Sequence, residues 1–170
     1  MDKRHLEIRK AQSFDAPLVL AYLNRVGGES DNLLFGAGEF SLTVEQEEKM
    51  IEGLNGSGTS VMLLGLMDGD IVSIGSVQSS ERPRIAHHGE IALSVSKACW
   101  GQGVGTLMME ALVQFGKEAG LELLHLGVRA DNIGGIRLYE KVGFRTFGTF
   151  PKYFNIGGNH YDKLLMGLEL

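Results

Sequence analysis

The sequence predicts an α+β protein, an α/β/α sandwich with a mixed central sheet of about six to seven strands and about four helices. Three observations predict this class. Segments with period-2 hydrophobicity alternate with segments of period 3.6. The elements follow the order β-α-α-β-β-β-α-β-α-β-β, and hairpin signals lie on both sides of the part in which strands and helices alternate. The length of 170 residues fits one domain with a single core, residues 1–170.

The chain begins with a strand and a helix. Leu6–Arg9 alternates as a strand does, and Ser13 is placed to cap a helix over Phe14–Asn24. Gly27–Ser41 is rich in glycine and shows no regular period. We therefore expect an irregular segment after the first helix.

A second helix and a hairpin follow. A capping box at Thr43–Gln46 predicts a helix that ends near Gly53. The apolar runs Ser60–Met67 and Ile71–Ser79 flank Asp68-Gly69, a dipeptide typical of tight hairpin turns. These runs predict two antiparallel strands.

The second half alternates strands and helices and closes with a hairpin. In the first of its helices, apolar residues recur at i, i+3, i+4, i+7, i+8 and i+11, as one buried face requires. Asn132 and Gly143 are placed as the N-cap and C-cap of the second helix. The expected elements are a strand at Glu90–Val95, a helix from Val104 to Phe115 stopped by Gly120, a strand at Leu123–Val128, a helix to Val142, and a hairpin of Arg145–Phe154 with Tyr161–Leu170 across Ile156–Asn159.

Composition and charge exclude several classes of function. A formal net charge of −5 with no run of lysine or arginine argues against a nucleic-acid surface. The single cysteine, Cys99, fits a reducing compartment, and without an activating partner it is expected to be a packed residue. Met1–Arg9 does not have the pattern of a signal peptide, and the apolar run Val61–Met67 is too short to span a bilayer. We expect a cytoplasmic protein that binds neither nucleic acid nor a membrane.

A glycine-rich turn at Gly101-x-Gly103-x-Gly105 joins a strand to a helix. Alternate glycines leave backbone N–H groups bare at the positive end of the helix, which favours an anion and most often a phosphate. Thr106 occupies the third glycine position of a Rossmann fingerprint, and the lysine of a Walker loop is absent. For the loop alone, a glycine-rich turn without a ligand remains the alternative.

The stretch from Glu90 to Phe144 resembles the acetyl-CoA-binding half of the GNAT N-acetyltransferases. The family has R/Q-x-x-G-x-G/A after a strand, where this chain has Trp100-x-x-Gly103-x-Gly105. Trp100 thus replaces an arginine or glutamine. The family then has N-x-x-A-x-x-L-Y-x-x-x-G-F, where this chain has Asn132-Ile-Gly-Gly-Ile-Arg-Leu138-Tyr139-Glu-Lys-Val-Gly143-Phe144.

The second block departs from the family pattern at Gly135, which replaces the usual alanine. Glycine inside a helix costs up to about 1 kcal/mol relative to alanine. The order of the elements over nearly the full chain also matches the family.

The resemblance implies acetyl-CoA as co-substrate and no metal. It implies that the backbone of Leu93, Ser94 and Val95 binds the pantetheine amides as an added strand does. It also implies that Asn132 contacts the pantetheine arm and that Tyr139 protonates the leaving thiolate. Without the motif, Tyr139 reads as a core aromatic. The pyrophosphate is expected on the backbone N–H groups of Gly101, Gln102, Gly103, Val104, Gly105 and Thr106.

The general base is less clearly marked. Glu90 opens the central strand near the position where family members often carry a glutamate that acts directly or through water. It reads equally well as an ordinary strand-edge carboxylate. Glu29 and Asp31, in the segment expected to face the acceptor, are weaker candidates. The His87-His88 pair lacks metal-ligand spacing around it and is expected in a solvated loop.

We expect an N-acetyltransferase that moves acetyl from acetyl-CoA to a primary amine by direct attack in a ternary complex. The alternative is a non-catalytic acyl-CoA-binding or sensor module on the same fold. The exposed end of the sheet suggests a homodimer. The expected acceptor is a cationic small molecule or a peptide amine, reached from the side of Gly27–Phe40 and Arg82–Glu90. Four acidic residues on that side could attract an ammonium: Glu29, Asp31, Glu39 and Glu90. Arg82 and Arg84 argue partly against this, because they could instead hold a carboxylate of the acceptor.

Overall fold

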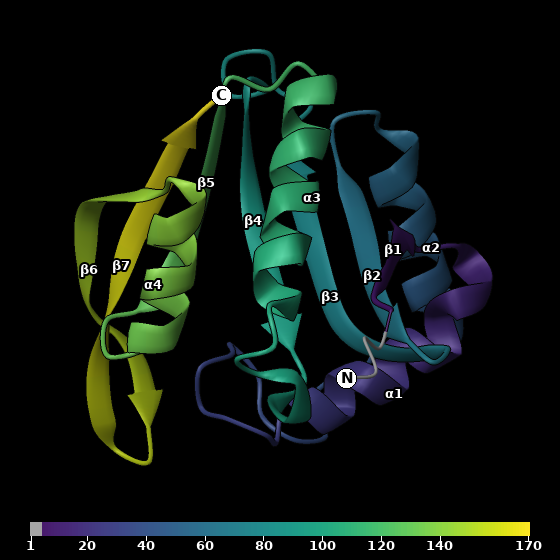
Figure 1. Ribbon diagram of the computed structural model, residues 1–170, viewed down its shortest axis with the longest axis horizontal. Helices are drawn as coiled ribbons and strands as arrows, with labels where there is room; N and C mark the ends of the chain where they lie inside the picture. Colours follow the sequence, from purple (N-terminus) through teal and green to yellow (C-terminus); the bar gives the residue numbers. More distant parts are fainter. Residues whose placement is uncertain (1–4) are drawn as a thin grey trace.

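A seven-stranded sheet runs through the centre of the computed structural model, which describes residues 5–170 (Figure 1). Residues 1–4, with which the argument against a signal peptide begins, lie outside the described residues. The strands are β1 (Glu7–Lys10), β2 (Val61–Met67), β3 (Asp70–Ser79), β4 (His88–Val95), β5 (Leu123–Arg129), β6 (Arg145–Ile156) and β7 (Asn159–Glu169). The helices are α1 (Ala16–Val26), α2 (Val44–Gly56), α3 (Val104–Glu118) and α4 (Ile133–Val142), with short 3-10 turns at Ser13–Asp15 and Lys97–Cys99.

The sheet is mixed, as expected. Its strand order is β1-β2-β3-β4-β5-β7-β6, and every neighbouring pair is antiparallel except β4 and β5. Helices α3 and α4 cover one face, while α1 and α2 cover the opposite face over β1, β2 and β3, with α1 also reaching the end of β4 through Tyr22 (Figure 1). Among residues 5–170, no helix covers the part of that second face formed by β5 and β7.

Two apolar clusters hold the helices to the sheet. On the α3 side, Met108 and Leu112 are fully buried against residues such as Val77 and Leu124. On the α1 side, Val19 and Ile51 are fully buried against β2 and β3. Each such side chain stabilises the fold by roughly 1.5–3 kcal/mol relative to its exposed state. The core therefore explains the periodic apolar residues of both helical faces.

The helix starts match the sequence at α2 and differ at α1. The Thr43 hydroxyl accepts from the Gln46 N–H at 3.2 Å, and the Gln46 amide oxygen accepts from the Thr43 N–H at 2.9 Å, which confirms the capping box. The prediction that Ser13 caps the first helix is wrong, because Ser13 lies within a 3-10 turn. Gln12 is the N-cap of this turn, and the Asp15 side chain, at the third position, accepts the Gln12 N–H at 2.8 Å.

Asp15 is also the centre of a buried ion pair. Its carboxylate accepts two bonds of 2.8 Å from the Arg9 guanidinium, and the residue is 2% exposed. The hydrogen bonds from Arg9 hold the pKa of Asp15 below its usual value. A depressed folded-state pKa contributes stability above the unfolded pKa of about 3.9, and this stability is lost as pH falls through the folded pKa.

We expect Asp15→Asn to lower the free energy of unfolding by about 2–3 kcal/mol at pH 7, because it leaves the arginine without its charge partner. The difference from wild type should shrink near pH 3. Urea unfolding at both pH values measures this. Glu45→Gln, which breaks an exposed pair with Lys49, is the control and should change stability by less than about 0.5 kcal/mol.

The strand ends differ slightly from expectation. The Asp68-Gly69 turn is confirmed, with both residues at positive φ, 53° and 85°. β4 begins at His88, two residues before the expected start, because His88 pairs in parallel with Leu123. The expectation of a solvated loop at His88 is therefore wrong. Its Nδ1 lies 3.1 Å from Nε2 of His125 on the neighbouring strand.

Candidate active site

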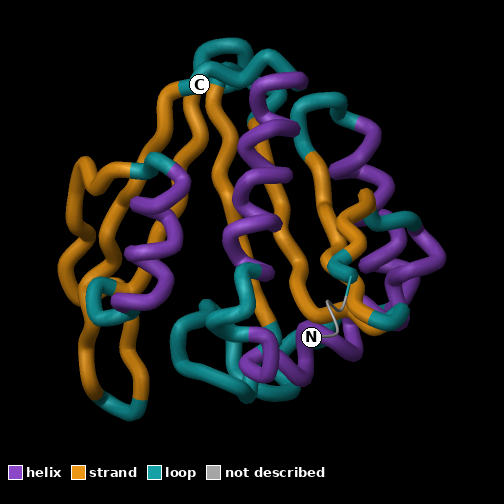
Figure 2. Tube along the Cα trace, viewed as in Figure 1, coloured by secondary structure: helices purple, strands orange, loops and turns teal. Residues whose placement is uncertain are grey.

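The parallel pair β4 and β5 is joined over only three residues, from His88↔Leu123 to Glu90↔His125. Beyond Glu90 the two strands separate, and we call this opening the fork (Figure 2). The part of β4 after Glu90 and the part of β5 after His125 are therefore neighbours in the sheet without being paired to each other. The unpaired backbone groups at the fork are a binding surface for an extended ligand.

The ladder between β3 and β4 decides which groups face the fork. The Ser96 N–H donates to the Val72 carbonyl at 2.8 Å. Because antiparallel ladders alternate, the backbone groups of Ser94 face β3, and those of Leu93 and Val95 face the fork. The backbone groups of Leu93 and Val95 therefore face the fork, where the resemblance implies the pantetheine arm. Ser94 directs its backbone away from the fork.

The expected anion site lies at the start of α3. Gly101 and Gly103 have φ of 72° and 85°, a region costly for other residues, and an added Cβ would meet nothing within 4 Å at either position. The first bond of the helix runs from the Leu107 N–H to the Gly103 carbonyl. The N–H groups before Leu107 are therefore directed outward, at the positive end of a 15-residue helix.

The other loop residues have distinct structural roles. An added Cβ at Gly105 would lie 2.9 Å from the Leu138 side chain, so this glycine allows α3 and α4 to pack closely. Val104 is buried in the core. The Gln102 side chain donates to the Ala98 carbonyl at 2.7 Å and stabilises the turn. Only the backbone N–H groups of these residues, with that of Thr106, remain for an anion.

Trp100 occupies the site of the family's arginine or glutamine. Its indole N–H donates to the Val95 carbonyl at 2.9 Å, and the ring is 47% exposed. The Lys97 ammonium lies 5.9 Å from the ring centroid. Trp100 therefore ties the glycine loop to the end of β4. The indole N–H is thus used within the chain, at a position where the resemblance implies a side-chain contact to the cofactor.

Asn132 and Gly135 act together at the start of α4. The Asn132 amide oxygen accepts from the Gly135 N–H at 3.0 Å, which confirms Asn132 as N-cap. An added Cβ at Gly135 would lie 2.7 Å from the Asn132 amide nitrogen. The departure from alanine thus makes room for the folded-back asparagine. The Asn132 Nδ2 group remains as a donor for a ligand.

Tyr139 projects from α4 into the apolar cluster that also contains Leu93, Val95 and Val104. Burial alone raises the pKa of Tyr139 to about 12. The phenol is therefore protonated at every physiological pH. A neutral donor in an apolar setting suits the stabilisation of a leaving thiolate.

Glu90 lies where the fork begins. It is exposed and pairs in register with His125 on β5 and Gln78 on β3. Residues directly opposite on paired strands share a face, so Glu90 and Ser94 face the same side of the sheet as α1, whose Tyr22 contacts Ser94. Glu90 and Tyr139 therefore approach the fork from opposite sides.

The two segments expected to flank the acceptor lie at opposite ends of β4. Arg82–Glu90 leads into its start, whereas Gly27–Phe40 reaches its end, where the Glu29 carboxylate accepts from the Lys97 N–H at 2.6 Å. The expectation that both segments lie near the start of the strand is wrong. The segment at the end of β4 also contacts β5, because Arg129 donates to the Asp31 carbonyl at 3.1 Å.

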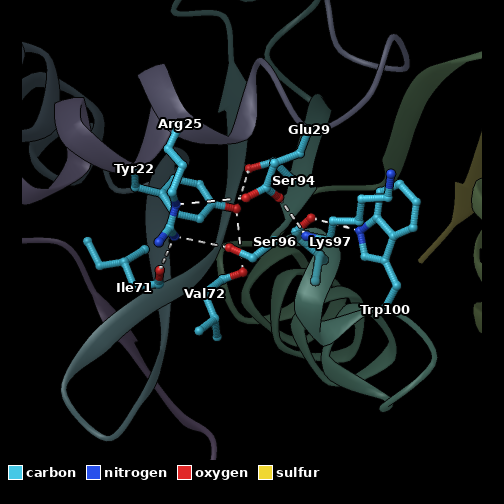
Figure 3. A network of polar contacts seen from close by, with 10 residues as sticks. Tyr22, Arg25, Glu29, Ile71, Val72, Ser94, Ser96, Lys97 and Trp100 are labelled. Atoms are coloured by element: carbon cyan, nitrogen blue, oxygen red, sulfur yellow. Dashed lines mark hydrogen bonds and ion pairs between the residues drawn. The ribbon is translucent and has the colours of Figure 1, made fainter. Parts of the chain in front are cut away.

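A polar network that the sequence did not reveal joins α1 to the end of β4 (Figure 3). The Tyr22 hydroxyl lies 3.1 Å from the Ser94 hydroxyl. Arg25 donates to the Ile71 carbonyl and the Ser96 hydroxyl, each at 3.2 Å, and its Nε lies 3.8 Å from the Glu29 carboxylate. Burial raises the pKa of Tyr22 to about 12.

The contacts of each carboxylate show which candidate bases are already engaged within the chain. Glu29 holds the loop after α1 against the residues that precede the glycine turn, so its carboxylate is already occupied. Glu39 accepts the Gly36 N–H at 2.7 Å and stabilises its own loop. Cys99 is half-buried beside the α3 cluster, as expected for a packed residue. Asp31 contacts Arg129 through its backbone carbonyl, in the segment at the end of β4, whereas Glu90 lies where the fork begins, so Glu90 is the stronger of the two remaining candidates.

Two further observations concern residues 5–170 as a whole. They contain no group of three or more His, Cys, Asp or Glu side chains arranged to hold a metal ion. None of their helices is long and apolar enough to cross a membrane.

Comparison with known proteins identifies similar chains over most of this length. A model of the acetyltransferase (GNAT) family matches residues 33–144. The crystal structure of a GNAT-family acetyltransferase from Streptococcus pneumoniae superposes with a TM-score of 0.95 and is 30% identical, over 98% of this chain and 100% of that one. A phosphinothricin acetyltransferase from Sinorhizobium meliloti, solved with acetyl-CoA, shares the fold at 14% identity and a TM-score of 0.84, over 97% and 88% of the two chains.

A curated relative is the L-amino acid N-acetyltransferase AaaT of Escherichia coli strain K12. It is 28% identical over 105 residues, which is 61% of this chain and 65% of that protein. The matches to the first curated relatives span between 47% and 65% of those proteins' lengths.

Proposed function

This chain belongs to the GNAT acetyltransferase family, and we propose that it transfers the acetyl group of acetyl-CoA to the primary amine of a bound acceptor. One arrangement carries the proposal. It combines the outward N–H groups at the start of α3, the fork-facing backbone of Leu93 with the N–H of Val95, and the Tyr139 phenol, which packs in the same cluster as both side chains. These three features suit a pyrophosphate, an extended pantetheine arm and a thioester respectively.

The fork performs the binding part of the reaction. N–H groups of β4 that face the fork donate to the pantetheine amides and to the thioester carbonyl, where negative charge develops as the amine attacks. The Asn132 Nδ2 group supports the same arm. Because both substrates are bound together in a ternary complex, the amine nitrogen attacks the thioester carbonyl carbon directly and the C–S bond breaks, so no covalent enzyme intermediate is needed.

Tyr139 stabilises the departing thiolate mainly as a hydrogen-bond donor. A thiol has a pKa near 8.5, so complete proton transfer from a phenol of pKa about 12 is uphill by about 3.5 pKa units, or roughly 5 kcal/mol. The acceptor ammonium loses two protons during the reaction. The general base removes the first before attack, and the second, lost from the nitrogen after attack, finally resides on the thiol. Tyr139 lowers the barrier by holding the sulfur while its charge is largest.

We propose Glu90 as the general base, acting directly or through water. Glu90→Gln should lower kcat/KM by about 10- to 100-fold at pH 7. The loss should shrink above pH 8, where an α-amine with a pKa near 8 is already neutral. Steady-state rates from pH 6.5 to pH 9.5 measure this, with Glu81→Gln in an exposed loop as control. A loss that is equal at every pH would make Glu90 a structural residue.

Release of free CoA tests the activity itself. Acetyl-CoA is incubated with a panel of amino acids, polyamines and peptides, and thiol is measured with and without each amine. Amine-dependent release is expected for at least one acceptor class. Calorimetric binding of acetyl-CoA without release in any of these mixtures would favour the acyl-CoA-binding module instead.

We also propose a homodimer in the cytoplasm. β6 is an edge strand of the sheet, and its Phe147, Phe150 and Tyr153 are 66%, 53% and 40% exposed. Exposed aromatics on a sheet edge favour a protein contact. Light scattering at micromolar concentration should give the mass of a dimer.

The free thiol of Cys99, the only cysteine, supports the reducing compartment.

A further inference from the structure

Lys163 is a half-buried cation on the face of the sheet that no helix covers. It lies on β7 opposite Arg129 of β5. Among residues 5–170, no carboxylate lies within 4.0 Å of its ammonium. A half-buried ammonium without an anion is unusual, because burial costs the charged form solvation that a partner normally replaces.

The strand beside Lys163 is shaped to receive its side chain. An added Cβ at Gly127 of β5 would lie 2.8 Å from the Lys163 ammonium and would overlap the methylene groups below it. Glycine weakens a strand interior and is found where another group approaches closely. Gly127 therefore lets the lysine stem lie flat across β5, toward the fork.

The surroundings hold the ammonium in place without neutralising it. It lies 4.2 Å from the centroid of the Tyr153 ring, a cation–π contact. It also faces His125, whose pKa is lowered by burial and further by the charges of His88 and Lys163. Glu90, in register with His125, has the opposite effect on that pKa.

Arg129 behaves differently, although it is the direct neighbour of Lys163. Its guanidinium makes two bonds to the Asp131 carboxylate, at 2.6 and 3.1 Å, and stacks 4.3 Å from the Tyr161 ring. Arg129 is thus already paired, and Lys163 is the cation still available at the acceptor side of the fork. Both lie on the face from which Glu90 approaches.

We infer that Lys163 binds an oxyanion carried by the acceptor, so that the substrate is an amine that also bears a carboxylate or a phosphate. This inference rests on the proposed transferase function and makes it more specific. The anionic group of the acceptor pairs with Lys163 while its amine is directed to the fork and to Glu90. A fixed positive charge at this position disfavours polyamines, contrary to the cationic acceptor expected from the sequence.

The test compares acceptors that differ only in the acid group. Rates are measured for a panel of L-amino acids, each paired with its amide, and for O-phosphoethanolamine paired with ethanolamine. We expect kcat/KM to favour the acid member by about 10- to 100-fold, the range of one charged hydrogen bond. Whichever acceptor, an amino acid or O-phosphoethanolamine, has the higher kcat/KM shows whether Lys163 binds a carboxylate or a phosphate. Lys163→Met keeps the stem over Gly127 and should reduce the preference to less than about 3-fold.

Two controls separate this inference from the function on which it rests. Lys117→Met, at an exposed position in the last turn of α3, should leave the preference unchanged, and the KM for acetyl-CoA should be unaffected in both variants. Turnover of amides, polyamines or peptides alone, or an equal loss for acids and amides in Lys163→Met, would overturn the role of Lys163 and leave the transferase intact. Absence of CoA release with every amine would overturn the proposed function itself.

Discussion

Gly103→Glu is expected to weaken acetyl-CoA binding by about 100-fold. Gly103 is the N-cap of α3, and an added side chain there would meet open space at the mouth of the anion site. A carboxylate placed about 4 Å from a phosphate costs roughly 4 kcal/mol at an effective dielectric constant of 20. Partial withdrawal of the flexible side chain reduces this to about 3 kcal/mol, which is close to a 100-fold change in Kd.

Gly158→Glu is a matched control for that variant. Gly158 has φ of 84° against 85° for Gly103, and both positions are open. The two changes therefore introduce the same charge and similar backbone strain, but Gly158 lies in the turn between β6 and β7. Calorimetry should show a normal Kd for Gly158→Glu. Equal Kd values in the two variants would remove the glycine loop from the binding site.

Tyr139→Phe is expected to lower kcat by about 10- to 100-fold, which is the range for one lost proton donor. The Kd for acetyl-CoA should change little, because the ring that packs beside Leu93 and Val95 remains. Since burial raises the pKa of Tyr139 to about 12, the phenol does not titrate below pH 9. The loss should therefore be the same factor from pH 6.5 to pH 9, unlike that of Glu90→Gln.

Stopped-assay rates and calorimetry on the same preparations measure both quantities. Tyr153→Phe, on the edge strand β6, removes a hydroxyl elsewhere and should retain wild-type kcat. Normal turnover in Tyr139→Phe would exclude the phenol from the reaction. A large rise in Kd with unchanged kcat would give Tyr139 a packing role only.

Features governed by neighbouring residues could be predicted from the sequence. The Thr43–Gln46 capping box, the Asp68-Gly69 turn and the caps of α4 each depend on groups within a few residues of one another, and the structure contains all of them. The motif containing Tyr139 belongs to the same class, because its spacing places the side chain on one face of a single helix. Local chemistry was therefore sufficient for the fold class, and the cofactor-binding residues named from the same motifs stay predictions.

Features that depend on distant segments could not be predicted. Glu29 was a candidate base because it carries a carboxylate in the segment expected to face the acceptor, but that carboxylate accepts from the N–H of Lys97, 68 residues away. Gly105 had the position of a phosphate-loop glycine, yet its close neighbour is Leu138 of another helix. The relation between Gly127 and Lys163 exists only when β5 and β7 pair. No periodicity or cap in the sequence records such contacts.

The separation of β4 from β5 gives this sheet an internal edge, in addition to its two outer ones. Edge strands with free N–H and C=O groups recruit stray strands from other chains, and proteins generally cover or interrupt them. Here the Trp100 indole occupies the Val95 carbonyl at one end of that edge. The bond from Trp100 to Val95 therefore shortens the unpaired part of β4 to which a strand of another chain could add while the site is empty.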